Sequence, residues 1–328
     1  MRAEPVEVTA GRPATDTARL GRLHVSRVGL GCNNFGQRCT QEETTAVVEA
    51  ALDVGITLFD TADIYGDTRS EQFLGQSLAG RRDDVVIGTK FGMRWGSLPG
   101  GTRPEDVRSA LTASLRRLGT DRIDLYQLHF PGPPMLPEPA RMDDVLGTLQ
   151  DLVAEGLVVE IGCANFSADQ LRSWAPAGTS GGFASVQNEY SLLRRDVESD
   201  VLPACADLCI GFLPYYPLAS GLLTGKYRRG VQAPADTRLA AGWTAWANRI
   251  DDELLDRIER LDAFARERDH TLLELAMSWL LAQPGVTAVT VGATRPDQVR
   301  ANVAATGWQL TAEELGLAAE ISRPGEGR

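Results

Sequence analysis

The sequence is poor in lysine and histidine. Of its 33 basic residues only Lys90 and Lys226 are lysines, and the 328 residues include three histidines. Because arginine supplies almost every positive charge, a lysine that remains indicates a position that needs a compact ammonium group with a tunable pKa. With so few histidines, a zinc site built from Cys and His is not expected.

Cysteine pairs and long apolar runs are also missing. The five cysteines form no CxxC motif, and Cys205 and Cys209 are spaced for one face of a helix, which predicts reduced thiols and no metal site. The N-terminus has no apolar core of a signal peptide. The longest apolar stretch, LLELAMSWLLA from Leu272, contains Glu274 and has only helix length. We therefore expect a cytoplasmic protein that does not enter a membrane.

The overall charge narrows the possible partners. The net charge is −11 and the pI is about 4.9, so the chain has no general attraction for nucleic acid or anionic membranes. With 43% hydrophobic and 23% charged residues, the composition is that of a globular protein. The length fits two ordinary domains or one α/β barrel.

Short apolar runs alternate with helical patterns along the chain. The runs are rich in Val, Ile and Leu and do not alternate with polar residues, which is typical of parallel strands covered on both faces. Alternation with helices indicates βαβ units. The eight expected strands are 28–31, 56–60, 84–90, 123–129, 157–163, 184–190, 209–216 and 286–292.

Eight such units favour a closed barrel. An open doubly wound sheet is the alternative, but it normally carries GxGxxG after its first strand. Here Gly29-Leu30-Gly31 is followed by Cys32-Asn33-Asn34, which is the wrong spacing. We predict an α/β protein: a single (β/α)8 TIM barrel with a short N-terminal hairpin and long βα loops. Residues 1–18 are expected to be a flexible leader and 19–328 the barrel domain.

Polar residues end successive strands. Asp60, Lys90 and His129 end the second, third and fourth strands, and Tyr65 follows Asp60 in the next loop. These ends meet at one rim of a barrel, where barrel enzymes have their active sites. An ammonium group lowers the pKa of a nearby phenol. With Asp60 holding Lys90, Tyr65 becomes a general acid, and His129 can orient a carbonyl oxygen.

This set of residues supports carbonyl chemistry. It contains no metal triad and no Ser–His–Asp arrangement, so hydrolysis is not supported. Proton donation alone does not reduce a carbonyl group, because a hydride donor is also needed and side chains cannot supply one.

Ordered motifs give the chain a family resemblance over about residues 19–310. They are Gly29-Leu30-Gly31, FDTADIYG at 59–66, GTKFG at 88–92, DLYQLH at 124–129, GCANFS at 162–167, VQNEYSLL at 186–193, YYPLASGLLTGKY at 215–227 and GATRPDQVRAN at 292–302. The chain resembles the aldo-keto reductases, nicotinamide-dependent barrel oxidoreductases, and more narrowly their bacterial and potassium-channel-β-subunit branch. The resemblance implies that Asp60, Tyr65, Lys90 and His129 are the catalytic tetrad, with Tyr65 as the acid.

The resemblance also implies a set of cofactor-binding residues. They are Gly31, Asn165, Gln187, Tyr215, Leu218, Gly221, Leu223, Lys226, Gly292, Thr294, Arg295, Gln298 and Asn302. Arg295 suits a 2′-phosphate, so we expect NADP(H), with NAD(H) as the alternative. Two departures from the family pattern, Ala164 and Val291, bear on cofactor affinity and preference.

Substrate contacts are expected from Asn34, Ile64, Phe91, Phe130 and the segment 228–250. The predicted function is NADPH-dependent reduction of an aldehyde or ketone. One alternative is an NAD(P)-dependent sugar dehydrogenase working in the oxidative direction, and another is a redox-sensing regulatory subunit that binds NADP(H). The expected partner is a small carbonyl compound, and the sequence indicates no oligomeric state.

Overall fold

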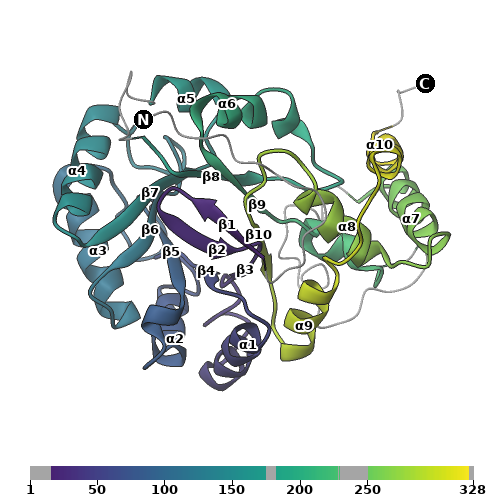
Figure 1. The fold of residues 1–328 in the computed structure, drawn as a ribbon. Coiled ribbons are helices and arrows are strands. Elements are labelled where there is room, and N and C mark those ends of the chain that lie inside the picture. Colours follow the sequence, from purple (N-terminus) through teal and green to yellow (C-terminus); the bar gives the residue numbers. More distant parts are fainter. Residues whose placement is uncertain (1–15, 175–181, 228, 230–249, 325–328) are drawn as a thin grey trace.

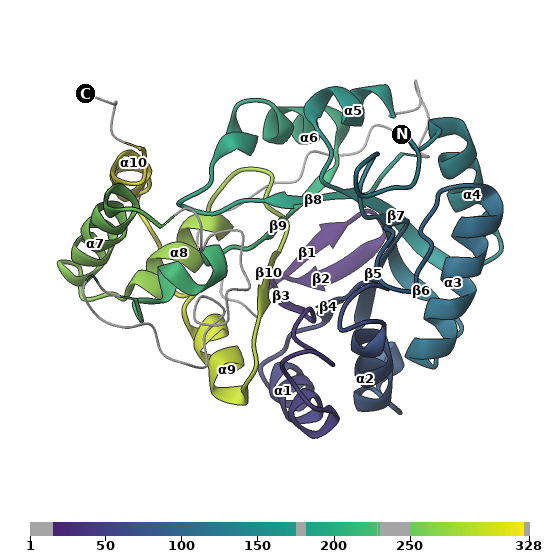
Figure 2. The same ribbon diagram turned by 180° about the vertical axis from the view of Figure 1, so that it is seen from behind.

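Eight parallel strands form a nearly closed barrel surrounded by helices (Figure 1; seen from behind in Figure 2). The fold comes from a computed structural model that describes residues 16–174, 182–227, 229 and 250–324. It confirms the predicted α/β barrel. The barrel strands are β3 (Val28–Gly31), β4 (Leu58–Asp60), β5 (Val86–Phe91), β6 (Ile123–Leu128), β7 (Val158–Ala164), β8 (Ser185–Glu189), β9 (Gly211–Tyr215) and β10 (Val289–Gly292).

The ring of strands closes incompletely between β9 and β10. Phe212 donates its N–H to the carbonyl of Gly285 at 3.2 Å and accepts from the N–H of Thr287 at 2.9 Å. Pro214 has no N–H with which to extend this ladder. Its carbonyl instead accepts a hydrogen bond from the Thr290 hydroxyl at 2.8 Å, so a side chain completes the junction.

Helices cover the outside of the barrel, and several begin at strong local signals. Thr40 and Thr271 form capping boxes with the glutamates three residues later. Gly119 ends the third helix in the left-handed conformation. The helices are α1 (Gln41–Asp53), α2 (Arg69–Ser77), α3 (Pro104–Leu118), α4 (Met142–Ala154), α5 (Ala168–Ser173), α6 (Val201–Leu208), α7 (Asp252–Arg266), α8 (Leu272–Leu281), α9 (Pro296–Ala304) and α10 (Ala312–Ile321).

The N-terminal hairpin lies across one end of the barrel (Figure 1). Its strands are β1 (Thr17–Leu20) and β2 (Leu23–Ser26), so the last two residues of the expected leader belong to β1. These residues form a strand because the hairpin packs against the barrel. The hairpin's apolar side chains form one buried cluster with residues at the strand starts, namely Leu20, Leu23 and Val25 with Leu58, Leu125, Leu213 and Ala288. Residues 1–15 of the leader lie outside the described part.

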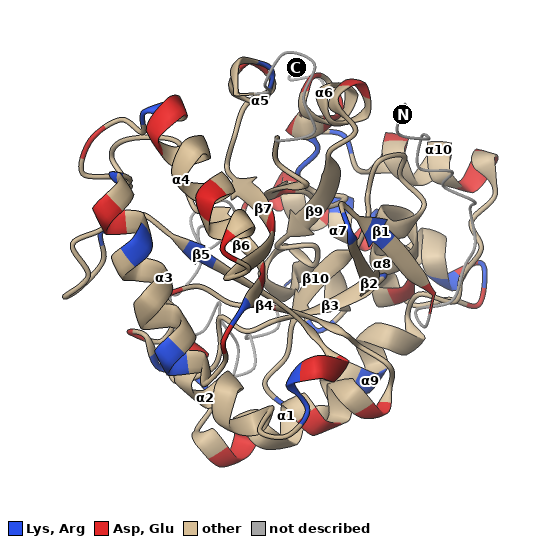
Figure 3. Ribbon diagram, turned by 60° about the vertical axis from the view of Figure 1, so that its left-hand side comes forward, with Lys and Arg blue, Asp and Glu red and all other residues tan. Residues whose placement is uncertain are grey.

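Charged residues are spread over the outer helices (Figure 3). Of the helices in the described ranges, none combines the length and apolar character needed to cross a membrane. Within the same ranges, no group of three or more His, Cys, Asp or Glu residues is arranged to hold a metal ion.

Candidate active site

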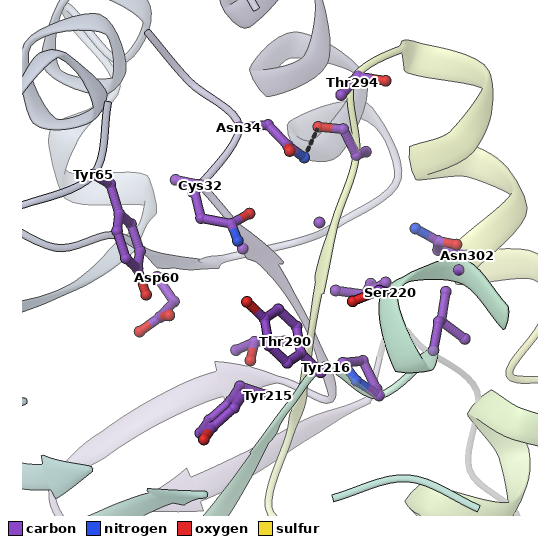
Figure 4. Close-up of a pocket in the computed structure, with 18 of the residues that line it drawn as sticks. Cys32, Asn34, Asp60, Tyr65, Tyr215, Tyr216, Ser220, Thr290, Thr294 and Asn302 are labelled. Carbon is purple, nitrogen blue, oxygen red and sulfur yellow. Dashed lines mark hydrogen bonds between the residues drawn. The ribbon is translucent and has the colours of Figure 1, made fainter. Parts of the chain in front are cut away.

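A cavity of about 750 Å³ opens at the carboxyl ends of the barrel strands, a size suited to a ligand of cofactor dimensions. Asp60 and Tyr65 lie at one side of it, and Thr294 and Asn302 at the other (Figure 4). Tyr215 lies in the wall between them. The cavity therefore joins the rim of β4 to the start of α9.

A buried ion pair lies beneath the side of the cavity that Asp60 and Tyr65 line. Lys90 is completely buried, and its Nζ contacts the two carboxylate oxygens of Asp60 at 2.8 and 2.7 Å. The same ammonium group donates to the carbonyl of Thr61 at 2.9 Å. The side-chain amides of Gln127 and Gln187 donate to Asp60 Oδ1 at 3.3 and 3.1 Å. One ammonium group and two amides therefore hold the Asp60 carboxylate in place.

Tyr65 and His129 lie over this ion pair. Lys90 Nζ is 5.3 Å from the centre of the Tyr65 ring, and the Tyr65 and His129 rings meet edge to face at 6.0 Å. Burial, reinforced by the charge of Lys90, holds the pKa of His129 well below its usual range. His129 is therefore neutral, and its buried Nδ1 has no hydrogen-bond partner among the described residues.

A tight turn holds Tyr65 in place. The N–H of Tyr65 donates to the carbonyl of Ala62 at 3.2 Å, and its carbonyl accepts from the N–H of Ser70 at 3.1 Å. The next residue, Gly66, has a φ of 58° and lies so close to the carbonyl of Phe35 that a Cβ would collide with it. Glycine is required there for both reasons.

Asn165 links the two walls of the cavity. It follows β7 in the left-handed conformation, with φ 63°, which asparagine tolerates better than most residues. Its amide donates to the carbonyl of His129 at 3.0 Å, and its Oδ1 accepts from the Tyr215 hydroxyl at 2.8 Å. Asn165 therefore fixes His129 relative to the ring of Tyr215.

The far half of the cavity has features that suit phosphate. Ala219, Ser220 and Gly221 are consecutive residues with positive φ, and Ser220 and Gly221 line the cavity. Lys226 lies over Gly221, with Nζ 2.9 Å from the position of an added Cβ. The start of α9 faces the same space with Arg295, and helix N-termini favour anions.

The structure brings most of the expected site residues to this cavity. Those that line it are Asp60, Tyr65, His129, Gly31, Asn165, Gln187, Tyr215, Leu218, Gly221, Lys226, Gly292, Thr294, Arg295, Gln298, Asn302, Asn34, Ile64 and Phe130. Lys90 lies beneath the lining, bound to Asp60.

Three expectations fit the geometry less well. Phe91 does not line the cavity: it follows the inward-facing Lys90 in β5, so it points outward and stacks on Tyr126 at 4.5 Å. Leu223 is completely buried behind the lining. Asn34 lines the cavity, but its amide donates to the carbonyl of Ala293 at 3.0 Å (Figure 4), away from Tyr65. Except for Arg229 and Ile250, the segment 228–250 lies outside the described residues.

Sequence reasoning missed several lining residues. Arg38, Tyr216, Ser220 and Thr290 all face the cavity. Tyr216 and Ser220 both have a left-handed backbone although they carry side chains, and in the sequence only the nearby Gly221 indicated an unusual backbone. Arg38 comes from the loop after β3, which Asn34 ties to the α9 side through Ala293.

Comparisons with known proteins show the family to which this chain belongs. The aldo/keto reductase family model matches residues 27–323. The chain is 34% identical over 304 residues to the aldo-keto reductase YhdN of Bacillus subtilis (strain 168), covering 89% of this chain and 88% of the relative. It is 35% identical over 281 residues to the NADH-specific methylglyoxal reductase of Escherichia coli (strain K12), covering 82% and 84%.

A solved structure is similar over nearly the whole fold. The glycerol dehydrogenase of Gluconobacter oxydans superimposes with a TM-score of 0.78 at 30% identity, covering 94% of this chain and 95% of that one. The chain therefore belongs to the aldo/keto reductase family of NAD(P)H-dependent oxidoreductases.

Proposed function

We propose that the protein reduces an aldehyde or ketone to an alcohol with NADPH, with Tyr65 as the general acid. The observation that carries this proposal is the buried Lys90–Asp60 pair beneath the Tyr65 ring, next to a neutral His129. Such a pair places a fixed positive charge where a phenol must lose its proton. It has no evident role in ligand binding alone.

The residues of the cavity fit a nicotinamide dinucleotide. The Lys226 ammonium group beside Gly221 and the start of α9 suit a pyrophosphate, and the Tyr215 ring offers a flat wall between the two halves. When bound there, this cofactor supplies the hydride that the side chains cannot. Asn165 and Gln187 are the side-chain amides that line the cavity beside His129 and Asp60, where the carboxamide would lie.

The side chains would then supply the proton and orient the carbonyl oxygen of the substrate. Tyr65 donates its proton to that oxygen, and the ammonium group of Lys90 stabilises the phenolate that remains. Neutral His129 donates a hydrogen bond to the same oxygen, which orients the carbonyl. Asp60 holds Lys90 in place, so the positive charge is organised before the reaction begins.

We infer a preference for NADPH from the charges at the α9 end. Arg38 and Arg295 both line this part of the cavity, and guanidinium groups pair well with phosphate. One feature opposes them: Asp297 Oδ1 is 3.2 Å from Arg295 Nε, so a 2′-phosphate would have to share Arg295 with a carboxylate. NADH is the alternative, and a 35% identical relative is named as NADH-specific.

The oxidative direction is the second candidate. A structural neighbour at 30% identity is named a glycerol dehydrogenase, and the same four side chains can act in reverse, with Tyr65 as the base. The experiment that separates the candidates measures turnover in both directions. NADPH or NADH is tested with aldehydes, ketones and sugars, and NADP⁺ or NAD⁺ with the matching alcohols. Absence of turnover with every pair, despite tight cofactor binding, would contradict both.

A further inference from the structure

A group of buried ionisable side chains lies behind the Tyr65 turn and has no part in the chemistry proposed above. Asp63 is 5% exposed, and Glu71 of α2 is completely buried. Asp63 precedes Tyr65 by two residues, and its N–H donates to the carbonyl of Lys90 at 3.3 Å. A change at Asp63 therefore reaches both Tyr65 and Lys90 through short connections.

Each cation that faces Asp63 is held by another carboxylate. Lys90 of β5 is bound by Asp60, and Arg117 of α3 is bound to Glu71 at 2.6 Å. Glu71 accepts a second hydrogen bond from the Thr89 hydroxyl at 2.6 Å.

Two other groups border Asp63. Tyr126 of β6 is one of them. Burial is the main cause of the raised pKa of its phenol, and the negative charge of Asp63 is the next. A backbone hydrogen bond from the N–H of Ile64 favours the charged form of the Asp63 carboxyl and lowers its pKa. The site therefore contains one more carboxyl group than it has cations to pair with.

The geometry at Asp63 disfavours a negative charge. Its Oδ1 is buried without a hydrogen-bond partner among the described residues, and an ionised carboxylate in such surroundings is costly. Burial, followed by the negative charge of Glu71, raises the pKa of the Asp63 carboxyl to about 8. Asp63 is then protonated at neutral pH, and Asp60 and Glu71 are left as the carboxylates that hold Lys90 and Arg117.

We propose that Asp63 is a positioning residue that supports the site only when protonated, and that its ionisation competes with Asp60 for Lys90 and turns the site off in alkaline solution. Lys90 is the cation of the proposed proton donor, its backbone carbonyl accepts from the Asp63 N–H, and its charge acts, after that of Arg117, on the Asp63 carboxyl. An added negative charge there weakens the field of Lys90 at Tyr65. For its effect on turnover, this inference rests on the proposed function.

The activity test compares Asp63→Asn with Asp67→Asn. Asp67 lies in the same loop but is exposed, and its left-handed backbone tolerates asparagine, so it is a matched control. Asp63→Asn should keep the wild-type kcat near neutral pH, and its alkaline limb should move to higher pH, while Asp67→Asn follows the wild type. If Asp63 carried a permanent charge, its removal would favour the Tyr65 phenolate and move the limb to lower pH. That result, or no movement, would overturn the proposal.

A second test needs no substrate. Between about pH 4, where a free aspartate ionises, and about pH 8, the folded protein keeps a proton on Asp63 that the unfolded chain has lost. The contribution of Asp63 to stability must therefore fall as pH rises through this window. Asp63→Asn lacks this loss, so its Tm relative to wild type should rise between about pH 5 and 8. A constant Tm difference would contradict the proposal even if no carbonyl substrate were found.

A third readout needs no variant, should Asp63→Asn fail to fold. Infrared spectra of the wild-type protein should contain the C=O band of a buried carboxylic acid, lost as the pH is raised through about 8. Absence of this band at neutral pH would overturn the assignment directly.

Discussion

Lys90 Nζ lies 2.7 Å from Asp60 Oδ2, and solvent reaches neither group to any useful extent. Removing one partner of such a pair leaves an uncompensated buried charge, at a cost of about 3–5 kcal/mol. We expect Lys90→Met to lower the free energy of unfolding by about this amount in urea denaturation. The double variant Asp60→Asn/Lys90→Met should recover most of the stability and remain inactive. A double variant as unstable as the single one would contradict this account.

Tyr65→Phe should lower kcat by about 10²–10⁴-fold, because it removes the proposed proton donor and keeps the ring. The dissociation constant of NADPH, measured by fluorescence quenching, should stay unchanged and shows that the variant is folded. Near-native turnover in Tyr65→Phe would mean that another group supplies the proton.

Arg295→Ala should weaken NADPH binding by about ten-fold, the effect of losing one charge-assisted hydrogen bond of about 1.5 kcal/mol. Binding of NADH should change little, because it lacks the 2′-phosphate. Titration of the variant and the wild type with both cofactors decides the matter. Equal losses of affinity for NADPH and NADH would contradict the assignment of the 2′-phosphate to Arg295.

Asp297→Asn tests the opposing charge in the same loop. The Asp297–Arg295 pair is exposed on both sides, and exposed pairs are worth about 0.2–1 kcal/mol. Releasing Arg295 should therefore tighten the binding of NADPH by up to about five-fold and leave the binding of NADH unaffected. Weaker NADPH binding in this variant would show that Asp297 orients Arg295 for the phosphate.

His129 gives a prediction in the acid range. Because burial and Lys90 keep the pKa of His129 well below its usual range, lowering the pH does not charge this ring until strongly acid conditions. The kcat for carbonyl reduction should therefore show no limb between about pH 5.5 and 7, where an ordinary histidine titrates. A limb that disappears in His129→Gln would contradict the neutral state.

The barrel and one side of the site could be predicted because their signals are local. Short apolar runs ending in Asp60, Lys90 and His129 define strands and rim together, and the parallel register then brings those ends into contact. The same alternation could have excluded Phe91, since a neighbour of Lys90 in β5 must face the other way. Helix α10 also had a signal, the capping box of Thr311 and Glu314.

Other parts of the site depend on contacts between segments far apart in the sequence. Arg38 reaches the cavity because Asn34 binds the carbonyl of Ala293, a link of 259 residues along the chain that no local pattern encodes. Ser220 adopts a left-handed backbone that its residue type does not favour. The Asp63 carboxyl is left without a cation of its own because Arg117 is paired with Glu71 and Lys90 with Asp60.

The hairpin β1–β2 separates two tasks within the molecule. It covers Leu58, Leu125 and Leu213 at one end of the barrel, and the reacting groups lie at the other end. Glu160 of β7 holds the hairpin turn in place, because its Oε1 accepts a hydrogen bond from the backbone N–H of Arg22 at 2.8 Å. Loops around the cavity can therefore be exchanged, in evolution or in the laboratory, while the hairpin still covers the apolar cluster at the opposite end. Changes of substrate specificity then need not expose apolar surface that would promote aggregation.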